Sequence, residues 1–191
     1  MTRSNQRISI RRMEKADIDA TLAFILPTLR EIYSNIPNVT ERWDLSHLED
    51  AYIKREDAVM FLAVDQRGNV VGTAASCRYD DRIGGIKGCY DCRSTAEVSR
   101  CYVDSSLRRQ GIGQLLFTAL EEYNRSIGFT TFCLHTHRFL PGGFPFWLSR
   151  DFEILREGGD QLATVYMDKR IALPVAMEQQ MIGEVIEEIS A

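Results

Sequence analysis

The chain has 191 residues and a net charge of −4, with 45% hydrophobic and 26% charged residues, which is typical of a soluble globular domain. The negative charge argues against general nucleic-acid binding, and no apolar run reaches the length of a membrane span. The N-terminal residues lack the apolar stretch of an export signal, so we expect a cytoplasmic protein without nucleic-acid or membrane partners.

Hydrophobic periodicity predicts a strand, two helices and a hairpin in the first 77 residues. The strand covers residues 8–12, and a helical pattern begins near residue 14 and continues to residue 35, kinked or restarted at Pro27. A second helix is expected over residues 45–55. Residues 59–64 and 70–77 are apolar and joined by a turn containing Gly68, which predicts an antiparallel hairpin.

Residues 97–113 read as a strand, a polar turn and a glycine-rich loop, followed directly by a helix. Apolar residues then recur at spacings of three and four from Ile112 to Tyr123, and Gly128 ends the helix. The first N–H groups of a helix lack internal partners and lie at the positive end of its dipole. Two arginines and two glycines beside that end therefore predict a pyrophosphate-binding turn.

Two familiar phosphate loops do not fit these residues. A Walker loop requires Lys-Ser/Thr after its last glycine, where this chain has Gln114-Leu115. A dinucleotide fingerprint requires a third glycine at the position of Leu116. A purely structural strand-to-helix turn remains the alternative.

The rest of the chain predicts a strand at 130–137, a short aromatic helix at 144–152 and two closing strands, 152–157 and 161–170. Beyond Pro174, an amphipathic helix is expected over residues 175–189, since Met177, Met181, Val185 and Ile189 are spaced by four.

The Arg/Gln-x-x-Gly-x-Gly pattern of residues 108–113 resembles the acetyl-coenzyme A loop of the GNAT superfamily of N-acetyltransferases. Residues 146–152 resemble the short-helix motif of that family, and residues 164–169 resemble its last strand. The resemblance covers residues 7–172 and implies an α/β fold. In that fold a mixed, mostly antiparallel sheet with a splayed strand pair is flanked by helices. Residues 173–191 are expected to form a C-terminal helical tail outside the domain.

The resemblance also implies which residues bind the cosubstrate, acetyl-coenzyme A. The backbone of Cys101 and Val103 would pair with the pantetheine arm, and the N–H of Cys101 would polarise the thioester carbonyl. The pyrophosphate would be bound by Arg108, Arg109, Gln110, Gly111, Ile112 and Gly113.

Acetyl transfer to an amine requires a base, because an ammonium ion has no lone pair. Glu97 stands at the spacing of the general base in the histone-acetylating branch; the alternative is a strand residue paired with an arginine such as Arg100. The family's usual proton donor is a tyrosine, whose position is taken here by Trp147, an indole that cannot release a proton. We therefore expect Tyr102, a thiol or water to serve instead.

Two other candidate sets are weaker. His135 and His137 share a face of one strand, where they either contact substrate or are hydrogen-bonded strand residues. Cys89 and Cys92 have metal-ligand spacing, but a four-cysteine zinc site needs a second close pair, so we expect no metal and reduced thiols.

The sequence thus predicts an acetyltransferase that uses acetyl-coenzyme A and an amine of a small molecule or peptide in a ternary complex, with a homodimer left open. The alternative is an acyl-coenzyme A-binding module that has lost catalysis. The eighteen-residue loop at 78–95 is expected to be mobile or functional. Its cations Arg82, Lys87 and Arg93 would select an acidic acceptor unless they are merely solvated; in that case Tyr33 and Trp43 become the candidates.

Overall fold

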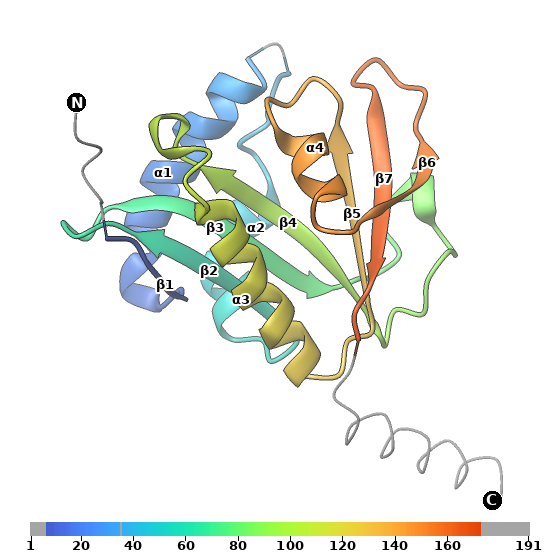
Figure 1. Cartoon of the computed structure of the whole chain (residues 1–191), viewed down its shortest axis with the longest axis horizontal. Coiled ribbons are helices and arrows are strands. Elements are labelled where there is room, and N and C mark those ends of the chain that lie inside the picture. The colour runs from blue at the N-terminus through green and yellow to red at the C-terminus, as the bar shows by residue number, and fades with distance from the viewer. Residues whose placement is uncertain (1–6, 35, 173–191) are drawn as a thin grey trace, which may run out of the picture. The chain divides into compact units, whose positions relative to one another are not determined.

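The computed structural model describes residues 7–34 and 36–172, and the predicted helix at 175–189 and the tail lie outside them. These residues form seven β-strands and four α-helices, a mixed α/β fold of the predicted class (Figure 1). They divide into two compact units. The first runs up to Arg78 and includes Glu97–Leu120, and the second comprises Tyr79–Ala96 and the chain from Glu121 onward.

The first unit has the strand order β1-β2-β3-β4. These strands are β1 (Ser9–Arg12), β2 (Ala58–Val64), β3 (Val70–Arg78) and most of β4 (Thr95–Val103). β1 and β3 both pair with β2 in antiparallel register, which confirms the predicted hairpin. Buried residues run through six of the seven positions of β2, as expected of a central strand covered on both faces.

Two long helices cover opposite faces of these strands (Figure 1). α1 (Ile18–Ile32) buries Thr21, Ile25 and Leu29, which lie four residues apart on one stripe. Pro27 lies inside this continuous helix and does not end it. α3 (Ile112–Ser126) begins at the glycine-rich loop, as predicted, and its first nine residues belong to the first unit.

The expected helix at 45–55 is instead two short pieces. α2 (Trp43–Ser46) is followed by a wide helical turn, Glu49–Ile53, with i to i+5 hydrogen bonding such as Lys54 N–H to the Glu49 carbonyl (3.0 Å). Leu45, Leu48 and Tyr52 from these pieces pack into one cluster with Ile25 and Leu29 of α1. This burial, worth about 1.5–3 kcal/mol per large apolar side chain, outweighs the regular helix expected from the sequence.

The second unit has the strand order β5-β7-β6. β5 (Thr131–His137) and β6 (Glu153–Glu157) both pair with β7 (Thr164–Arg170) in antiparallel register. The short helix α4 (Gly143–Leu148) follows β5, as the aromatic motif predicted. All five residues of β6 are exposed, as on an outer strand.

Candidate functional site

β4 is distorted at Arg100, whose φ of 53° lies in the left-handed region although the strand continues on both sides. Successive side chains of a regular strand point to opposite faces. Here the Ser99 hydroxyl lies 3.5 Å from the Tyr52 hydroxyl, and the next residue, Arg100, binds Asp44 beside that same tyrosine. Two consecutive side chains on one face, with a left-handed residue between regular segments, define a β-bulge.

The bulge changes which residues of β4 share a face. Alternation backward from Ser99 places Glu97 on the face of Tyr52, and alternation forward from Arg100 places Tyr102 there. Tyr102 does pack against the cluster that contains Tyr52, and Glu97 is buried, with 3% of its surface exposed. In an unbulged strand these two residues, an odd number of positions apart, would point to opposite faces.

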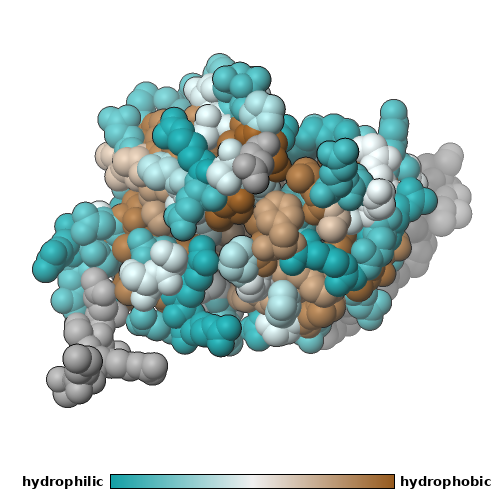
Figure 2. Space-filling model, turned by 90° about the horizontal axis from the view of Figure 1, so that it is seen from above, coloured by the Kyte–Doolittle hydropathy of each residue, from teal (hydrophilic) through white to brown (hydrophobic). Residues whose placement is uncertain are grey.

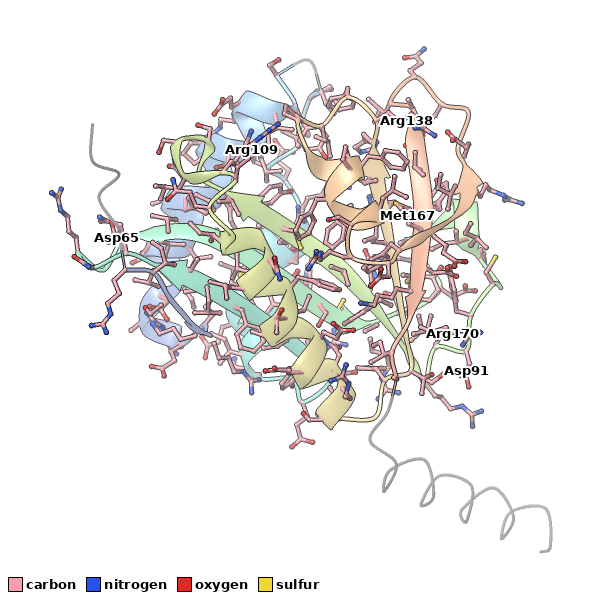
Figure 3. All side chains as sticks on the ribbon, in the orientation of Figure 1. Asp65, Asp91, Arg109, Arg138, Met167 and Arg170 are labelled. Carbon is pink, nitrogen blue, oxygen red and sulfur yellow. The ribbon has the colours of Figure 1, made fainter. Side chains whose placement is uncertain are left out.

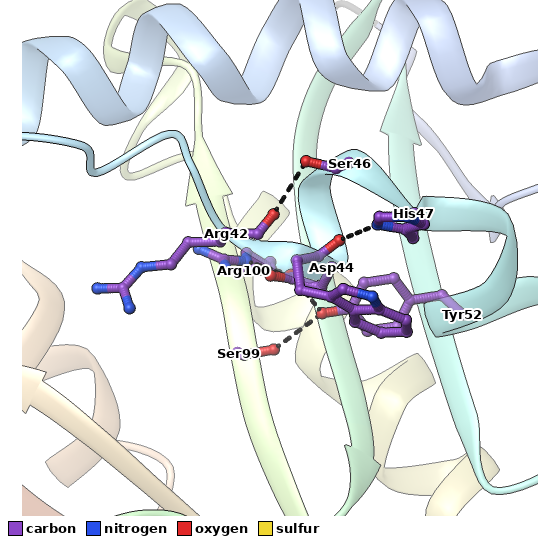
Figure 4. Close-up of polar contacts among 8 residues, drawn as sticks. Arg42, Asp44, Ser46, His47, Tyr52, Ser99 and Arg100 are labelled. Atoms are coloured by element: carbon purple, nitrogen blue, oxygen red, sulfur yellow. Dashed lines mark hydrogen bonds and ion pairs between the residues drawn. The ribbon is translucent and has the colours of Figure 1, made fainter.

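A partly buried ion pair joins β4 to α2 (Figure 4). Arg100 donates Nε and Nη2 to the two carboxylate oxygens of Asp44, each at 2.7 Å, and Tyr52 donates its hydroxyl to Asp44 Oδ2 at 2.9 Å. Burial alone would raise the pKa of Asp44, but the hydrogen bonds and charge of Arg100 outweigh it, so this pKa is lowered. Burial opposes the charge of Arg100 as well, yet Asp44 raises the pKa of the guanidinium. Arg100 therefore pairs with Asp44, which the sequence did not indicate.

Cys101 follows the bulge and has a buried thiol. Its Sγ donates to the Ser99 carbonyl at 3.4 Å, and burial raises its pKa to about 12. A thiol with this pKa is protonated at neutral pH and is a poor nucleophile. The sulfur of Cys101 is therefore a poor candidate for a nucleophile.

The turn after β4 is organised by Asp104. Its Oδ1 accepts hydrogen bonds from the N–H and hydroxyl of Ser106, and its own N–H donates to the Val71 carbonyl at 2.9 Å. A 3-10 turn, Ser105–Leu107, follows. Arg108 then folds back, and its Nε donates to the Val103 carbonyl at 3.2 Å, so this carbonyl already has a partner within the chain.

The glycine-rich loop presents the first turn of α3. Leu115 N–H donates to the Gly111 carbonyl (3.0 Å), so the N–H groups of residues 112–114 precede the first i to i+4 bond of the helix. Gly111 has a φ of 83°, and no atom lies within 4 Å of the position where a Cβ would stand. Arg109 (φ 62°) and Arg108 are exposed beside it; Arg109 is labelled in Figure 3. Ile112 is buried and anchors the turn.

A polar pocket of about 320 Å³ opens at the end of α1 in the first unit. It is lined by Arg30, Tyr33, Ser34, Ile36, Asn38, Val39, Thr40 and Glu41. Burial raises the pKa of Tyr33, and the nearby Tyr102 adds to this effect while the charges of Arg100 and Arg42 oppose it. The pocket therefore lies in electrostatic reach of the bulged part of β4.

Trp43 is exposed over 59% of its surface and stacks on His47, with the ring centroids 5.1 Å apart. The face of the molecule drawn in Figure 2 is mostly hydrophilic, with apolar residues between the polar ones. An exposed tryptophan adjacent to Asp44 is one of the few large apolar groups available for ligand contact in the first unit.

The two histidines of β5 differ in their surroundings. His135 is exposed, whereas His137 is buried with Nδ1 3.2 Å from the hydroxyl of Thr164, its partner across the strand pair. Thr164 has one hydroxyl proton, which it donates to Asp160 Oδ2 at 2.6 Å. His137 must therefore carry its proton on Nδ1. Of the two interpretations considered for this pair, His137 fits that of a hydrogen-bonded strand residue.

Trp147, at the position of the family tyrosine, is buried in α4 and contacts Phe146 and Phe152 edge to face, with centroids 4.9 and 5.1 Å apart. Phe152 in turn stacks on Phe132 of β5. Trp147 thus contributes to the aromatic core of the second unit, where the sequence had assigned it no role.

The loop at 78–95 is anchored at several points rather than open. The Gly85 carbonyl accepts from Arg156 Nη1 (3.0 Å), Tyr90 donates its hydroxyl to Asp168 (3.1 Å), and Ile86 is buried. A Cβ at Gly85 would overlap the ring of Tyr166. Two of the three loop cations pair within the loop, Arg82 with Asp80 at 2.7 Å and Arg93 with Asp91 at 3.3 Å, which weakens their case as an acceptor site.

Across residues 7–34 and 36–172, no three His, Cys, Asp or Glu side chains are grouped so as to hold a metal ion. None of the five cysteines, all of which lie in the described part of the chain, forms a disulfide bond. None of the helices in the described part of the chain is long and apolar enough to cross a membrane.

The sequence missed two features of this site. The Asp44–Arg100 pair joins residues 56 positions apart, and one sequence contains no signal for such a contact. The bulge at a non-glycine residue leaves no signal either, because Arg100 looks like an ordinary strand residue.

Residues 26–141, more than half of the chain, match the model of the acetyltransferase (GNAT) family. The chain therefore belongs to the GNAT acetyltransferase family. A search of curated proteins found no significant match.

Many solved structures share the fold. A GNAT-family acetyltransferase from Staphylococcus aureus superposes with a TM-score of 0.71 at 17% identity, over 87% of this chain and 100% of that one. The PaiA N-acetyltransferase of Thermoplasma acidophilum, solved in complex with coenzyme A, gives 0.67 at 18% identity, over 86% and 99%. The ribosomal-protein-S18-alanine N-acetyltransferase of Escherichia coli gives 0.59 at 16% identity, over 88% and 96%. At these identities the likeness concerns the fold.

Proposed function

We propose that the protein transfers an acetyl group from acetyl-coenzyme A to a primary amine of a small molecule or peptide, by direct attack in a ternary complex. The observation that carries this proposal is the bulged strand leading through a glycine turn into the open first turn of α3. In that arrangement the N–H groups of residues 112–114 and the exposed Arg108 and Arg109 suit a pyrophosphate. The coenzyme A complex of the PaiA neighbour is consistent with this assignment.

Cys101 and Glu97 have distinct roles in the proposed reaction. The N–H of Cys101 would stabilise negative charge developing on the thioester oxygen. Glu97, turned by the bulge to the face of Tyr102, would take a proton from the ammonium group of the acceptor, directly or through water, and the neutral amine would then attack the thioester carbon. The high pKa of the Cys101 thiol disfavours a covalent acetyl-cysteine route and supports direct attack.

Tyr102 is the candidate proton donor for the departing thiolate. Its pKa is raised by burial, against the charge of Arg100, so the hydroxyl holds its proton at neutral pH. Tyr102 would thus donate the proton that the tyrosine of the short-helix motif donates in the family, because the indole of Trp147 cannot release a proton.

For the acceptor we favour the first unit over the loop at 78–95. The pocket beside Tyr33, with Arg42 and Trp43 on the following segment, offers polar, cationic and aromatic contacts, whereas two of the loop cations are already paired. The S18-alanine N-acetyltransferase neighbour supports keeping peptide amines among the acceptors to be tested.

The alternative, a module that binds an acyl-coenzyme A without turnover, is favoured by Trp147 alone. A single experiment separates the two: thiol release from acetyl-coenzyme A measured over a panel of amines, with coenzyme A affinity measured by calorimetry. Amine-dependent thiol release supports the enzyme. Tight binding without release for any amine supports the module, and absence of binding refutes both.

A further inference from the structure

The left-handed conformation of Arg100 must be held by its surroundings. A residue with a Cβ is disfavoured at positive φ, and a conformation of this kind persists where neighbouring groups impose it. Arg100 lies inside a strand, where no turn or loop requires the conformation.

Contacts from two elements fix Arg100 at both its backbone and its side chain. From β3, the buried Thr73 donates its hydroxyl to the Arg100 carbonyl at 2.7 Å. From α2, Asp44 accepts both guanidinium hydrogen bonds at 2.7 Å. Asp44 is itself oriented by the hydroxyl of Tyr52, at 2.9 Å.

We propose that Thr73 and Asp44 are positioning residues for the transfer reaction, acting through Arg100. They hold the bulge that turns Glu97 and Tyr102 to one face of β4 and that sets the direction of the next N–H, that of Cys101. This inference rests on the proposed function, and neither residue is assigned a contact with the reacting atoms.

These contacts fix the register of β4 more than they raise the free energy of unfolding. A buried ion pair is a weak source of net stability, because desolvation offsets the attraction, and fixing register is its best-supported use. A strand that loses its bulge shifts by one residue, and every side chain beyond the shift changes face. Loss of the contacts that Thr73 and Asp44 make with Arg100 would therefore misplace Tyr102 and the Cys101 N–H, while the hydrophobic core of the first unit would persist.

Thr73 gives the cleaner test. Thr73→Val keeps the shape of the side chain and removes the donor, and Thr73→Ser keeps the donor. We expect Thr73→Val to lower kcat by on the order of 10- to 100-fold, the scale of a small misplacement of catalytic groups. Coenzyme A affinity should fall by less than kcat, because the glycine-rich loop at residues 108–113 lies outside these contacts, and Thr73→Ser should restore kcat. A wild-type kcat in Thr73→Val would overturn the inference.

Substitutions at Arg100 and Asp44 separate the effect of backbone strain from that of the ion pair. Both Arg100→Gly and Arg100→Ala remove the pair with Asp44, but only glycine adopts the left-handed conformation without the penalty of a Cβ, so their comparison isolates backbone strain. We expect Arg100→Ala to lose more turnover than Arg100→Gly, and Asp44→Asn to cost little further in the Arg100→Gly background. Equal losses in the two Arg100 variants would contradict a positioning role.

A readout without turnover keeps this test distinct from that of the proposed function. The three-bond HN–Hα coupling of residue 100 reports its φ, and the chemical shift of the Cys101 amide reports the local environment of that N–H. We expect both to change in Thr73→Val and to be retained in Thr73→Ser. If the wild type releases no thiol with any amine, the proposed function fails. Separately, an unchanged coupling in Thr73→Val would refute the claim that Thr73 holds the conformation of Arg100.

Discussion

Glu97 is a buried carboxylate on the strand that also carries Cys101, and its proposed role as base gives a direct prediction. Glu97→Gln keeps the size of the side chain but cannot accept a proton from the amine. We expect turnover at pH 7 to fall about 100-fold or more, the usual contribution of a general base, while coenzyme A affinity is retained. The deficit should shrink as pH rises, because the free amine becomes more abundant.

The matched control is Glu122→Gln, which removes an exposed carboxylate from α3. Its turnover should equal that of the wild type. Near-normal turnover in Glu97→Gln at neutral pH would refute the assignment and transfer the role to a water chain or a histidine.

His137 makes stability dependent on pH. Burial lowers its pKa, against a smaller opposing effect of Asp160, so the folded protein binds the His137 proton less readily than the unfolded chain. Below the unfolded pKa of about 6.5, protonation therefore favours unfolding, and this contribution to stability is lost as pH falls through the lower folded value.

His137→Asn tests this contribution, because an asparagine amide can still donate to Thr164 but does not titrate. Measured by urea unfolding from pH 7.5 to pH 5, the wild type should lose more stability than the variant. Parallel curves for the two proteins would contradict the assigned cause.

At the scale of elements, the loop before α3 depends on Gly111, at φ 83°. Gly111→Val should lose about 1 kcal/mol or more of stability through backbone strain, and it should also lose coenzyme A affinity because its side chain fills the open approach to the helix. Calorimetry and urea unfolding measure the two effects separately.

Gly111→Asn distinguishes the two causes, since asparagine adopts the left-handed region more readily than valine. We expect it to retain stability but still bind coenzyme A more weakly than the wild type. Wild-type affinity in Gly111→Val would show that the loop does not bind the phosphates.

The elements that the sequence predicted well have local causes. The β2–β3 hairpin and the transition from β4 through Gly111 into α3 follow from apolar spacing and turn residues within a few positions. The helix over 45–55 failed because the packing of Leu45 and Tyr52 against α1 selected two short pieces. Such tertiary contacts override a local pattern and cannot be read from it.

The sequence likewise predicted only those parts of the candidate site that have local causes. The glycine-rich loop follows from residue types at fixed spacings, and Glu97 was chosen through the resemblance to the GNAT family; the structure places Glu97 in a buried position on β4. The bulge, the Asp44–Arg100 pair and the Thr73 hydroxyl bond depend on contacts between distant segments, so they required coordinates.

At the scale of the whole molecule, the chain passes between its two units three times, and two of these crossings fall inside β4 and α3. Unfolding of either unit must therefore break a strand and a helix that belong to both. We predict one cooperative unfolding transition for the protein.

The two tryptophans, Trp43 in the first unit and Trp147 in the second, provide separate probes of this transition. Fluorescence of Trp43→Phe reports the second unit, and fluorescence of Trp147→Phe reports the first. In each variant the denaturant midpoint from fluorescence should coincide with that from far-ultraviolet circular dichroism. Separated midpoints within one variant would show that the units unfold independently.

The close approach of Gly85 to the ring of Tyr166 has an evolutionary consequence. At the neighbouring Gly84, by contrast, an added Cβ would meet no atom of another part of the chain within 4 Å, so that position carries no such steric constraint. Position 85 is coupled to position 166, because a side chain at 85 and a tyrosine ring at 166 would occupy the same space. Descendants of this sequence that gain a side chain at 85 should therefore carry a smaller residue at 166, a paired change between positions 81 residues apart.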